Sequence, residues 1–214
     1  MNNKLKKSLT ISVLIILAGA ILALAGIALP FEGSAKYAVE FPQIWLCMLA
    51  SVVFALLFGF ARVDRAHAAA MSLALLNDFL LSLSVTAIAS LIIKGVSEMP
   101  AAVVFPITMM LSFVFSFAQS TVVLRSANRL MRTTTRKEKP LEQIAEEAPK
   151  ASMKGRIGML IVSFVFLLAL AFGGKKLIPI AAPLMLSSLV AFFTSGCITA
   201  QIWAIFTKKF KFKQ

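Results

Sequence analysis

The sequence predicts an all-α polytopic membrane protein with six transmembrane helices. Of its 214 residues, 59% are hydrophobic and only 14% are charged, and the mean hydropathy is +0.89. A soluble domain is nearer half apolar and a quarter charged, so this chain has too few polar side chains to cover a soluble globule of its size. Backbone groups inside a bilayer must be satisfied within the chain, so we expect the membrane-crossing segments to be helices.

Six apolar runs approach the roughly 20 residues that a helix needs to cross the hydrocarbon core. They cover residues 9–29, 44–61, 68–93, 101–124, 157–172 and 177–206. The last run is long enough to tilt, kink or continue beyond the membrane. The loops at 93–100 and 173–176 are short, so we expect two tight helical hairpins, one from runs three and four and one from runs five and six.

These runs divide the chain into four parts. Residues 1–43 hold the first transmembrane helix and a short outer segment, and residues 44–124 hold the next three helices. Residues 125–155 form a basic loop that is expected to be cytoplasmic. Residues 156–214 hold the last two helices and a basic C-terminal tail.

The basic residues predict how the chain is oriented. One set of loops and tails holds 18 of the 22 lysine and arginine residues, and the alternate set holds 4. By the positive-inside rule both termini are cytoplasmic, as six crossings require. An alternative is a cleaved signal peptide, because "NKLKK" precedes an apolar run with "ALA" at residues 23–25. The run continues to Leu29, which favours an uncleaved first helix.

The basic loop contains a candidate amphipathic helix in "KPLEQIAEEAPK". Helical spacing places four apolar side chains on one face and three acids elsewhere. The apolar residues are Leu141, Ile144, Ala145 and Ala148, and the acids are Glu142, Glu146 and Glu147. This pattern predicts a short helix that lies at the membrane interface or on a neighbouring span and that Pro149 ends or kinks. A solvated linker is the alternative.

Several classes of function have no support in the sequence. The net charge is +13, but the basic residues lie between the apolar runs and do not alternate with exposed aromatic residues, so we expect no nucleic-acid partner. Unspecific contact with anionic lipid or ribosomal RNA stays open. Cys47 and Cys197 lie in apolar runs without metal-site spacing. The only histidine, His67, is expected in a short loop. No catalytic triad, phosphate-binding glycine loop or HExxH motif is present. We therefore expect no enzyme, no metal and no cofactor.

One carboxylate stands inside an apolar run. Asp78 lies within "SLALLNDFLLSLSV", with Asn77 beside it. An aspartate at the centre of a membrane helix costs roughly 2.5–3.5 kcal/mol, so Asp78 is expected to face the bundle interior. Two interpretations are open: an ion or proton path, and a structural hydrogen bond between helices.

Other polar residues in the runs are candidates for the same interior. Gln119 carries an amide that needs a partner, whereas Ser120 and Thr121 can bond back to their own helix. Arg156 opens the fifth run and can reach lipid phosphate. In the sixth run, Ser195 and Gly196 offer small surfaces for helix packing.

Four stretches together resemble the protein-export subunit SecF. "ALLND" at residues 74–78 resembles the family's "ALLHD", and "STVVLRSANRLMR" resembles "DTVVVFDRIRENLR". "PLEQIAEEAPKASMKGRI" resembles a cytoplasmic segment of the family, and "LALAFGGKKLIPI" begins a stretch that resembles its closing hairpin. A fifth stretch, "KYAVEF" at residues 36–41, resembles the segment after the family's first span, so the resemblance covers about residues 36–203.

The resemblance implies a SecDF-type half-transporter bundle, related to the resistance–nodulation–division transporters, in the bacterial cytoplasmic membrane. It implies a SecD-like partner, association with the Sec channel and membrane lipid, and assistance to a translocating polypeptide through proton flow. Asp78 matches the aspartate of the family motif.

The sequence departs from the family in three ways, and the lack of the family's fourth-span acid weakens the expectation that this chain itself carries protons. The family's outer domain is reduced here to residues 30–43. An acid of its fourth span falls on Gln119, which cannot carry a proton in the same way. The arginine of its fifth span falls between Lys154 and Arg156, and the motifs do not decide between them. A scaffold without transport, or an independent small-molecule transporter, are the alternatives.

Overall fold

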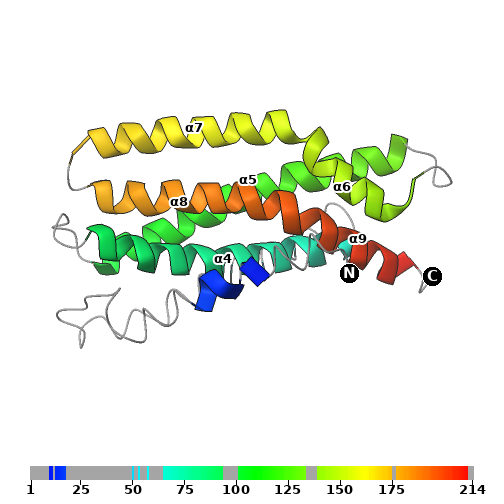
Figure 1. Cartoon of the computed structure of the whole chain (residues 1–214), viewed down its shortest axis with the longest axis horizontal. Coiled ribbons are helices and arrows are strands. Elements are labelled where there is room, and N and C mark those ends of the chain that lie inside the picture. The colour runs from blue at the N-terminus through cyan, green and yellow to red at the C-terminus, as the bar shows by residue number, and fades with distance from the viewer. Residues whose placement is uncertain are drawn as a thin grey trace.

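The computed structural model describes residues 65–93, 101–133, 139–174 and 177–211, together with residues 10–11, 13–17, 50, 53 and 57. Throughout these ranges the regular secondary structure is helical, and no strand is present (Figure 1). The described part therefore confirms the all-α class. The expected first two crossings, 9–29 and 44–61, lie almost wholly outside the described residues.

Four described helices are long and apolar enough to cross a membrane. The segments are Arg65–Val85, Met110–Thr133, Met153–Phe172 and Ile180–Phe210. They account for the third to sixth predicted crossings. The boundaries differ mainly at the charged ends, where helices continue past the apolar runs from which they were predicted.

Helix α4 (Arg65–Ile93) and helix α5 (Ala101–Thr133) pack against each other, as the short connection between them predicts. The hydroxyl groups of Ser82 and Ser112 meet at 2.5 Å between them. Helix α7 (Met153–Phe172) and helix α8 (Ile178–Thr194) form the second packed pair.

Helix α8 is the central element of the bundle. It packs against α4, α5 and α7, and Figure 1 shows it between α7 and α4. Helix α7 lies on the outside, and apolar side chains such as Val162 (70% exposed) and Val165 (62%) cover its outer face. In a membrane protein such an apolar face can contact lipid acyl chains.

The sixth predicted run is one continuous helical path with an interruption. After α8 the chain forms a π-helical turn, η2 (Ser195–Thr199), and continues as α9 (Ala200–Lys211). A π turn inserts one residue into the helix and opens its hydrogen-bond ladder. The sixth run was expected to tilt, kink or continue beyond the membrane. The interruption in it lies at residues 195–199.

The amphipathic helix is confirmed as α6 (Leu141–Ala151). Ile144, Ala145 and Ala148 are buried, and α6 packs against α5 and α9. Pro149 does not end the helix, which continues to Ala151.

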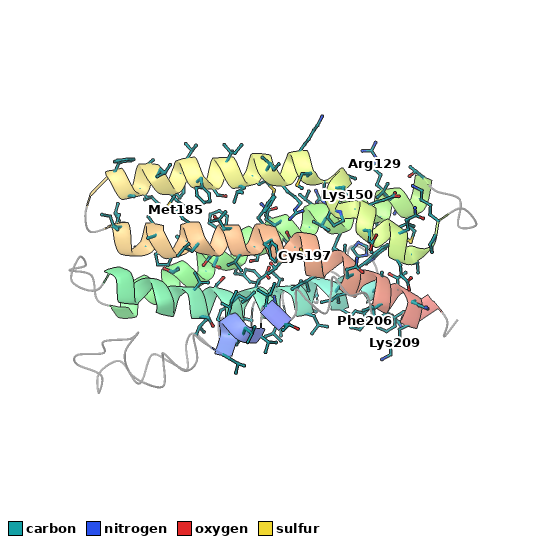
Figure 2. The ribbon with its side chains drawn as sticks, viewed as in Figure 1. Arg129, Lys150, Met185, Cys197, Phe206 and Lys209 are labelled. Carbon is teal, nitrogen blue, oxygen red and sulfur yellow. The ribbon has the colours of Figure 1, made fainter. Side chains whose placement is uncertain are left out.

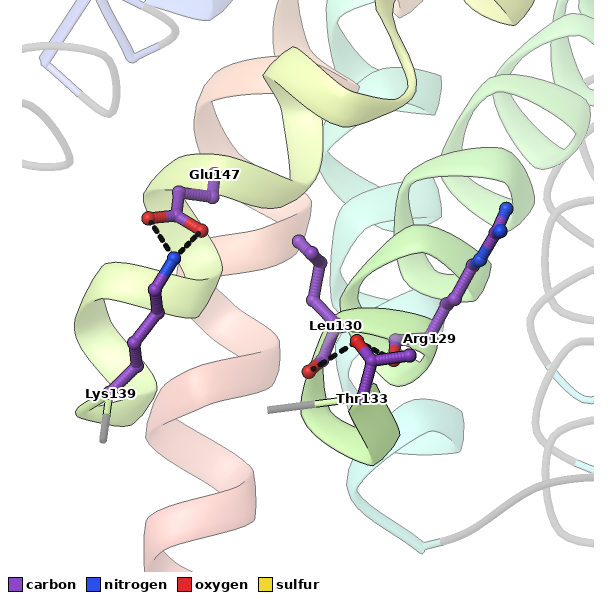
Figure 3. A network of polar contacts seen from close by, with 5 residues as sticks. All are labelled: Arg129, Leu130, Thr133, Lys139 and Glu147. Carbon is purple, nitrogen blue, oxygen red and sulfur yellow. Dashed lines mark hydrogen bonds and ion pairs between the residues drawn. The ribbon is translucent and has the colours of Figure 1, made fainter. Parts of the chain in front are cut away.

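Figure 3 shows polar contacts at α6 and at the C-terminal end of α5. Lys139 Nζ lies 2.8 Å from Glu147 Oε2, and the Thr133 hydroxyl donates to the carbonyl oxygens of Arg129 and Leu130. The ion pair is partly exposed, so its contribution is within about 1 kcal/mol. Burial of the apolar face holds α6 in place.

Exposed basic side chains gather at one end of the bundle, which we call the basic end. There α5 and α9 end and α4 and α7 begin, and Figure 2 shows Arg129 and Lys209 directed outward. Its exposed residues are Arg65, Arg125, Arg129, Arg132, Lys150, Lys154, Lys208 and Lys209.

His67 corrects one sequence prediction. It is not in a loop but in the first turn of α4, where only 5% of it is exposed. Trp203 Nε1 donates to His67 Nδ1 at 3.1 Å, so Nε2 carries the ring proton and bonds to the Leu124 carbonyl oxygen at 3.3 Å. The neutral ring thus joins α4, α5 and α9.

Trp203→Phe is expected to lower the free energy of unfolding by about 2–3 kcal/mol, because a buried hydrogen bond is lost and a gap is left. Chemical denaturation in detergent micelles measures this change. Phe210→Leu, at an exposed position of the same helix, is the control. A loss below 1 kcal/mol for Trp203→Phe would show that the Trp203–His67 bond is not part of what holds these helices together.

Candidate functional site

Asp78 lies near the middle of α4 and is 1% exposed. Its Oδ1 accepts a long bond of 3.4 Å from Asn77 Nδ2. The side chains of Ser116 and Thr194 lie nearby, and the Thr194 hydroxyl donates to the Val190 and Ala191 carbonyl oxygens of its own helix. Its Oδ2 is buried and has no hydrogen-bond partner among the described residues. Such an oxygen is costly to bury, so the site is polar but incompletely satisfied.

Arg156 is the buried cation of the bundle interior. It is 2% exposed although it stands near the start of α7, whereas Lys154, two residues earlier, is exposed. Its Nη2 donates to the Phe192 carbonyl oxygen and to Ser195 Oγ at 3.1 Å. Its Cζ lies 4.4 Å from the centroid of the Phe192 ring. Of the two basic residues Lys154 and Arg156, Arg156 is therefore the one that faces the bundle interior.

No carboxylate among the described residues forms an ion pair with this guanidinium group. Its Nε is buried without a hydrogen-bond acceptor in the same part of the chain. Arg156 is instead held by a carbonyl oxygen beside the π turn, by a hydroxyl group and by an aromatic face. A cation that is held by dipoles and a ring, without a paired carboxylate among the described residues, can attract an anion or orient water.

Gln119 ties α5 to α7. Its Nε2 donates to the Arg156 carbonyl oxygen at 3.2 Å, and its Oε1 is buried without a donor among the described residues. Next to it, the hydroxyl groups of Ser120 and Thr199 meet at 3.3 Å, so Ser120 does not bond back to its own helix. Thr121 does, to the Phe117 carbonyl oxygen at 2.7 Å.

These contacts form one connected group, which we call the interior polar layer. Thr194 and Ser195 are adjacent in sequence and connect the Asp78 side to the Arg156 side. The layer consists of Asp78, Ser116, Gln119, Arg156, Thr194 and Ser195. Three of its polar atoms have no partner in the described ranges, so it has capacity to hold water, a proton or an ion.

The structure joins most of the residues singled out from the sequence. Asp78, Gln119, Arg156 and Ser195 belong to the layer, Asn77 lies at its edge, and Lys154 lies outside it. Ser116 and the Phe192 carbonyl group were missed, because a serine in an apolar helix usually bonds to its own backbone. Among the described residues, no group of three His, Cys, Asp or Glu side chains is placed to bind a metal.

Gly196 makes room for the guanidinium group. A Cβ atom at this position would lie 2.8 Å from Nη1 and from Nη2 of Arg156, and 3.1 Å from Cζ. The two distances of 2.8 Å are shorter than Cβ contacts in real proteins, so a side chain here would displace the guanidinium group. Gly196 was expected to serve helix packing, and it does so by accommodating one particular side chain.

Gly196→Ala is expected to lower the free energy of unfolding by about 2–3 kcal/mol, because Arg156 would lose charged hydrogen bonds while still buried. Gly158→Ala is the matched control, since a Cβ there meets nothing within 4 Å and alanine is the better helix former. Denaturant titration in micelles distinguishes the two. Equal stability of both variants would mean that Arg156 moves aside without cost.

Comparison with known proteins identifies no relative: no family model, curated protein or solved structure matches the chain. The resemblance to SecF therefore rests on the sequence stretches that carry it.

Proposed function

We propose that this chain is a SecF-like subunit of the bacterial cytoplasmic membrane that assists Sec-dependent protein export. A SecD-like chain and the Sec channel are its proposed partners, and both termini are proposed to be cytoplasmic. The observation that supports this most is Asp78. The aspartate of the "ALLND" stretch is fully buried in the bundle, with one oxygen atom unpartnered among the described residues.

Proton coupling in this proposal is reduced or is shared with the partner. Asp78 is the one carboxyl group of the interior polar layer. Gln119 cannot titrate, and its amide is already engaged with the Arg156 carbonyl oxygen. A relay needs groups that change protonation in turn, so further groups would have to come from the SecD-like chain.

A non-transporting scaffold is the second candidate. The Gln119 contact favours it, because an amide that fixes α5 to α7 serves a structural role where the family has an acid. An independent small-molecule transporter is third, since it would require a chain that is stable and active by itself.

Affinity purification from the native membrane, after crosslinking and with mass spectrometry of the captured proteins, tests the proposal. We expect SecD-like and Sec channel subunits, crosslinked at reproducible positions. The control is the same purification without crosslinker and with an unrelated tagged membrane protein. Recovery of the chain alone, or with unrelated transport proteins, would refute the export function.

A further inference from the structure

One face of α5 changes from apolar to cationic along its length. Met110 (61% exposed) and Val114 (56%) lie on this face, and three exposed arginines follow. The arginines are Arg125, Arg129 and Arg132, and steps of three or four residues connect the whole series through Ala118 and Thr121. Residues at such spacing share one side of a helix. The face that is exposed among apolar residues therefore continues directly into the arginines.

The three arginine side chains have no polar partner among the residues that the structure describes. Within the described ranges none of them donates a hydrogen bond or forms an ion pair. Figure 3 shows Arg129 directed away from α6, whereas Leu130 points towards it. The acids of α6 therefore do not neutralise this face.

The dimensions fit a membrane surface. At 1.5 Å per residue, Arg125 lies about 16 Å along the helix from Val114, and Arg132 lies about 10 Å further. The headgroup region on each side of the hydrocarbon core is about 5–7 Å thick. When Met110 and Val114 contact acyl chains, the arginines begin in the headgroup region and extend just past it.

We propose that Arg125, Arg129 and Arg132 form a binding surface for the phosphate groups of anionic phospholipids. The acyl chains of these lipids extend along α5 from the arginines towards Val114. Three unpaired cations favour an anionic lipid over a zwitterionic one, and a guanidinium group can grip phosphate with two hydrogen bonds. This surface is separate from the interior polar layer and does not depend on the export function.

The test is native mass spectrometry of the full chain in detergent, titrated separately with phosphatidylglycerol and phosphatidylcholine. The wild type is expected to prefer phosphatidylglycerol. R125Q/R129Q/R132Q is expected to bind it at least tenfold more weakly, since each arginine near a membrane surface is worth about fivefold. K154Q/K208Q/K209Q removes three exposed charges from the same basic end and is expected to stay within about twofold of the wild type.

Two outcomes would overturn the proposal: unchanged phosphatidylglycerol binding in the arginine variant, or an equal loss in the lysine variant, which would indicate unspecific attraction. If the triple variant does not fold, R125Q and R129Q are measured singly, each with an expected loss of about fivefold. Inorganic phosphate at millimolar concentration should not displace the lipid. Displacement by a short RNA at equal phosphate concentration would assign the surface to nucleic acid instead.

Discussion

Replacing Arg156 by methionine is expected to raise the free energy of unfolding by about 1–4 kcal/mol. Burying a cation costs several kcal/mol, and two hydrogen bonds with one ring contact offset only part of it when no carboxylate is paired. Methionine fills a similar volume with apolar atoms. The substitution leaves no new unsatisfied acceptor, because Ser195 Oγ also donates to the Phe192 carbonyl oxygen at 3.1 Å.

Denaturant titration in micelles gives this number directly. Lys154→Met on the same helix is the control and is expected to change stability by less than about 0.5 kcal/mol, because that side chain is exposed. Arg156→Ala should be about 2–3 kcal/mol less stable than Arg156→Met because it leaves a cavity. A methionine variant that is weaker than the wild type by more than 1 kcal/mol would show that the guanidinium group is structural.

Asp78→Asn is expected to reduce protein export at least tenfold while the chain stays folded. Asparagine keeps the shape of the side chain and its capacity for hydrogen bonds but cannot take up or release a proton. Export of a secreted precursor, measured in cells that depend on this chain, reads out the effect. Asn77→Ala is the matched control, since Asn77 is only half-buried and its bond to Asp78 is long, at 3.4 Å.

The opposite result would be equally informative. Normal export by Asp78→Asn would exclude a proton-carrying role for this carboxyl group and support the scaffold. Loss of export together with loss of folded protein would assign Asp78 to helix packing. Urea or detergent resistance of the purified variant therefore accompanies the export assay.

Local sequence patterns predicted the helices but not every boundary. The apolar face of Ile144, Ala145 and Ala148 is encoded within eleven residues, so α6 could be predicted from spacing alone. His67 was predicted to lie in a loop because the apolar run of the third crossing begins only at Ala68. Its helical, buried position depends on Trp203, which is 136 residues away in the sequence.

The candidate site was predictable in composition but not in geometry. A single residue of register turns a helical side chain by about 100°, so motifs that disagree by one or two residues could not choose between Lys154 and Arg156. Burial in the assembled bundle shows which of the two faces the interior, namely Arg156. The π turn depends in the same way on contacts that no local pattern contains.

The π turn also sets the rotational phase between α8 and α9. The one residue that it inserts turns everything after it by about 100° relative to an uninterrupted helix. The π turn η2 lies between Phe192, whose carbonyl group binds Arg156, and Trp203. The rotation that it introduces is what directs Trp203 towards His67. If the π turn moved past Trp203, the Trp203 indole would rotate away from the His67 imidazole. The hydrogen bonds of Arg156 to Phe192 and Ser195 would change in the same step. A single-residue slip would thus change the Trp203–His67 contact and the Phe192–Arg156 contact together.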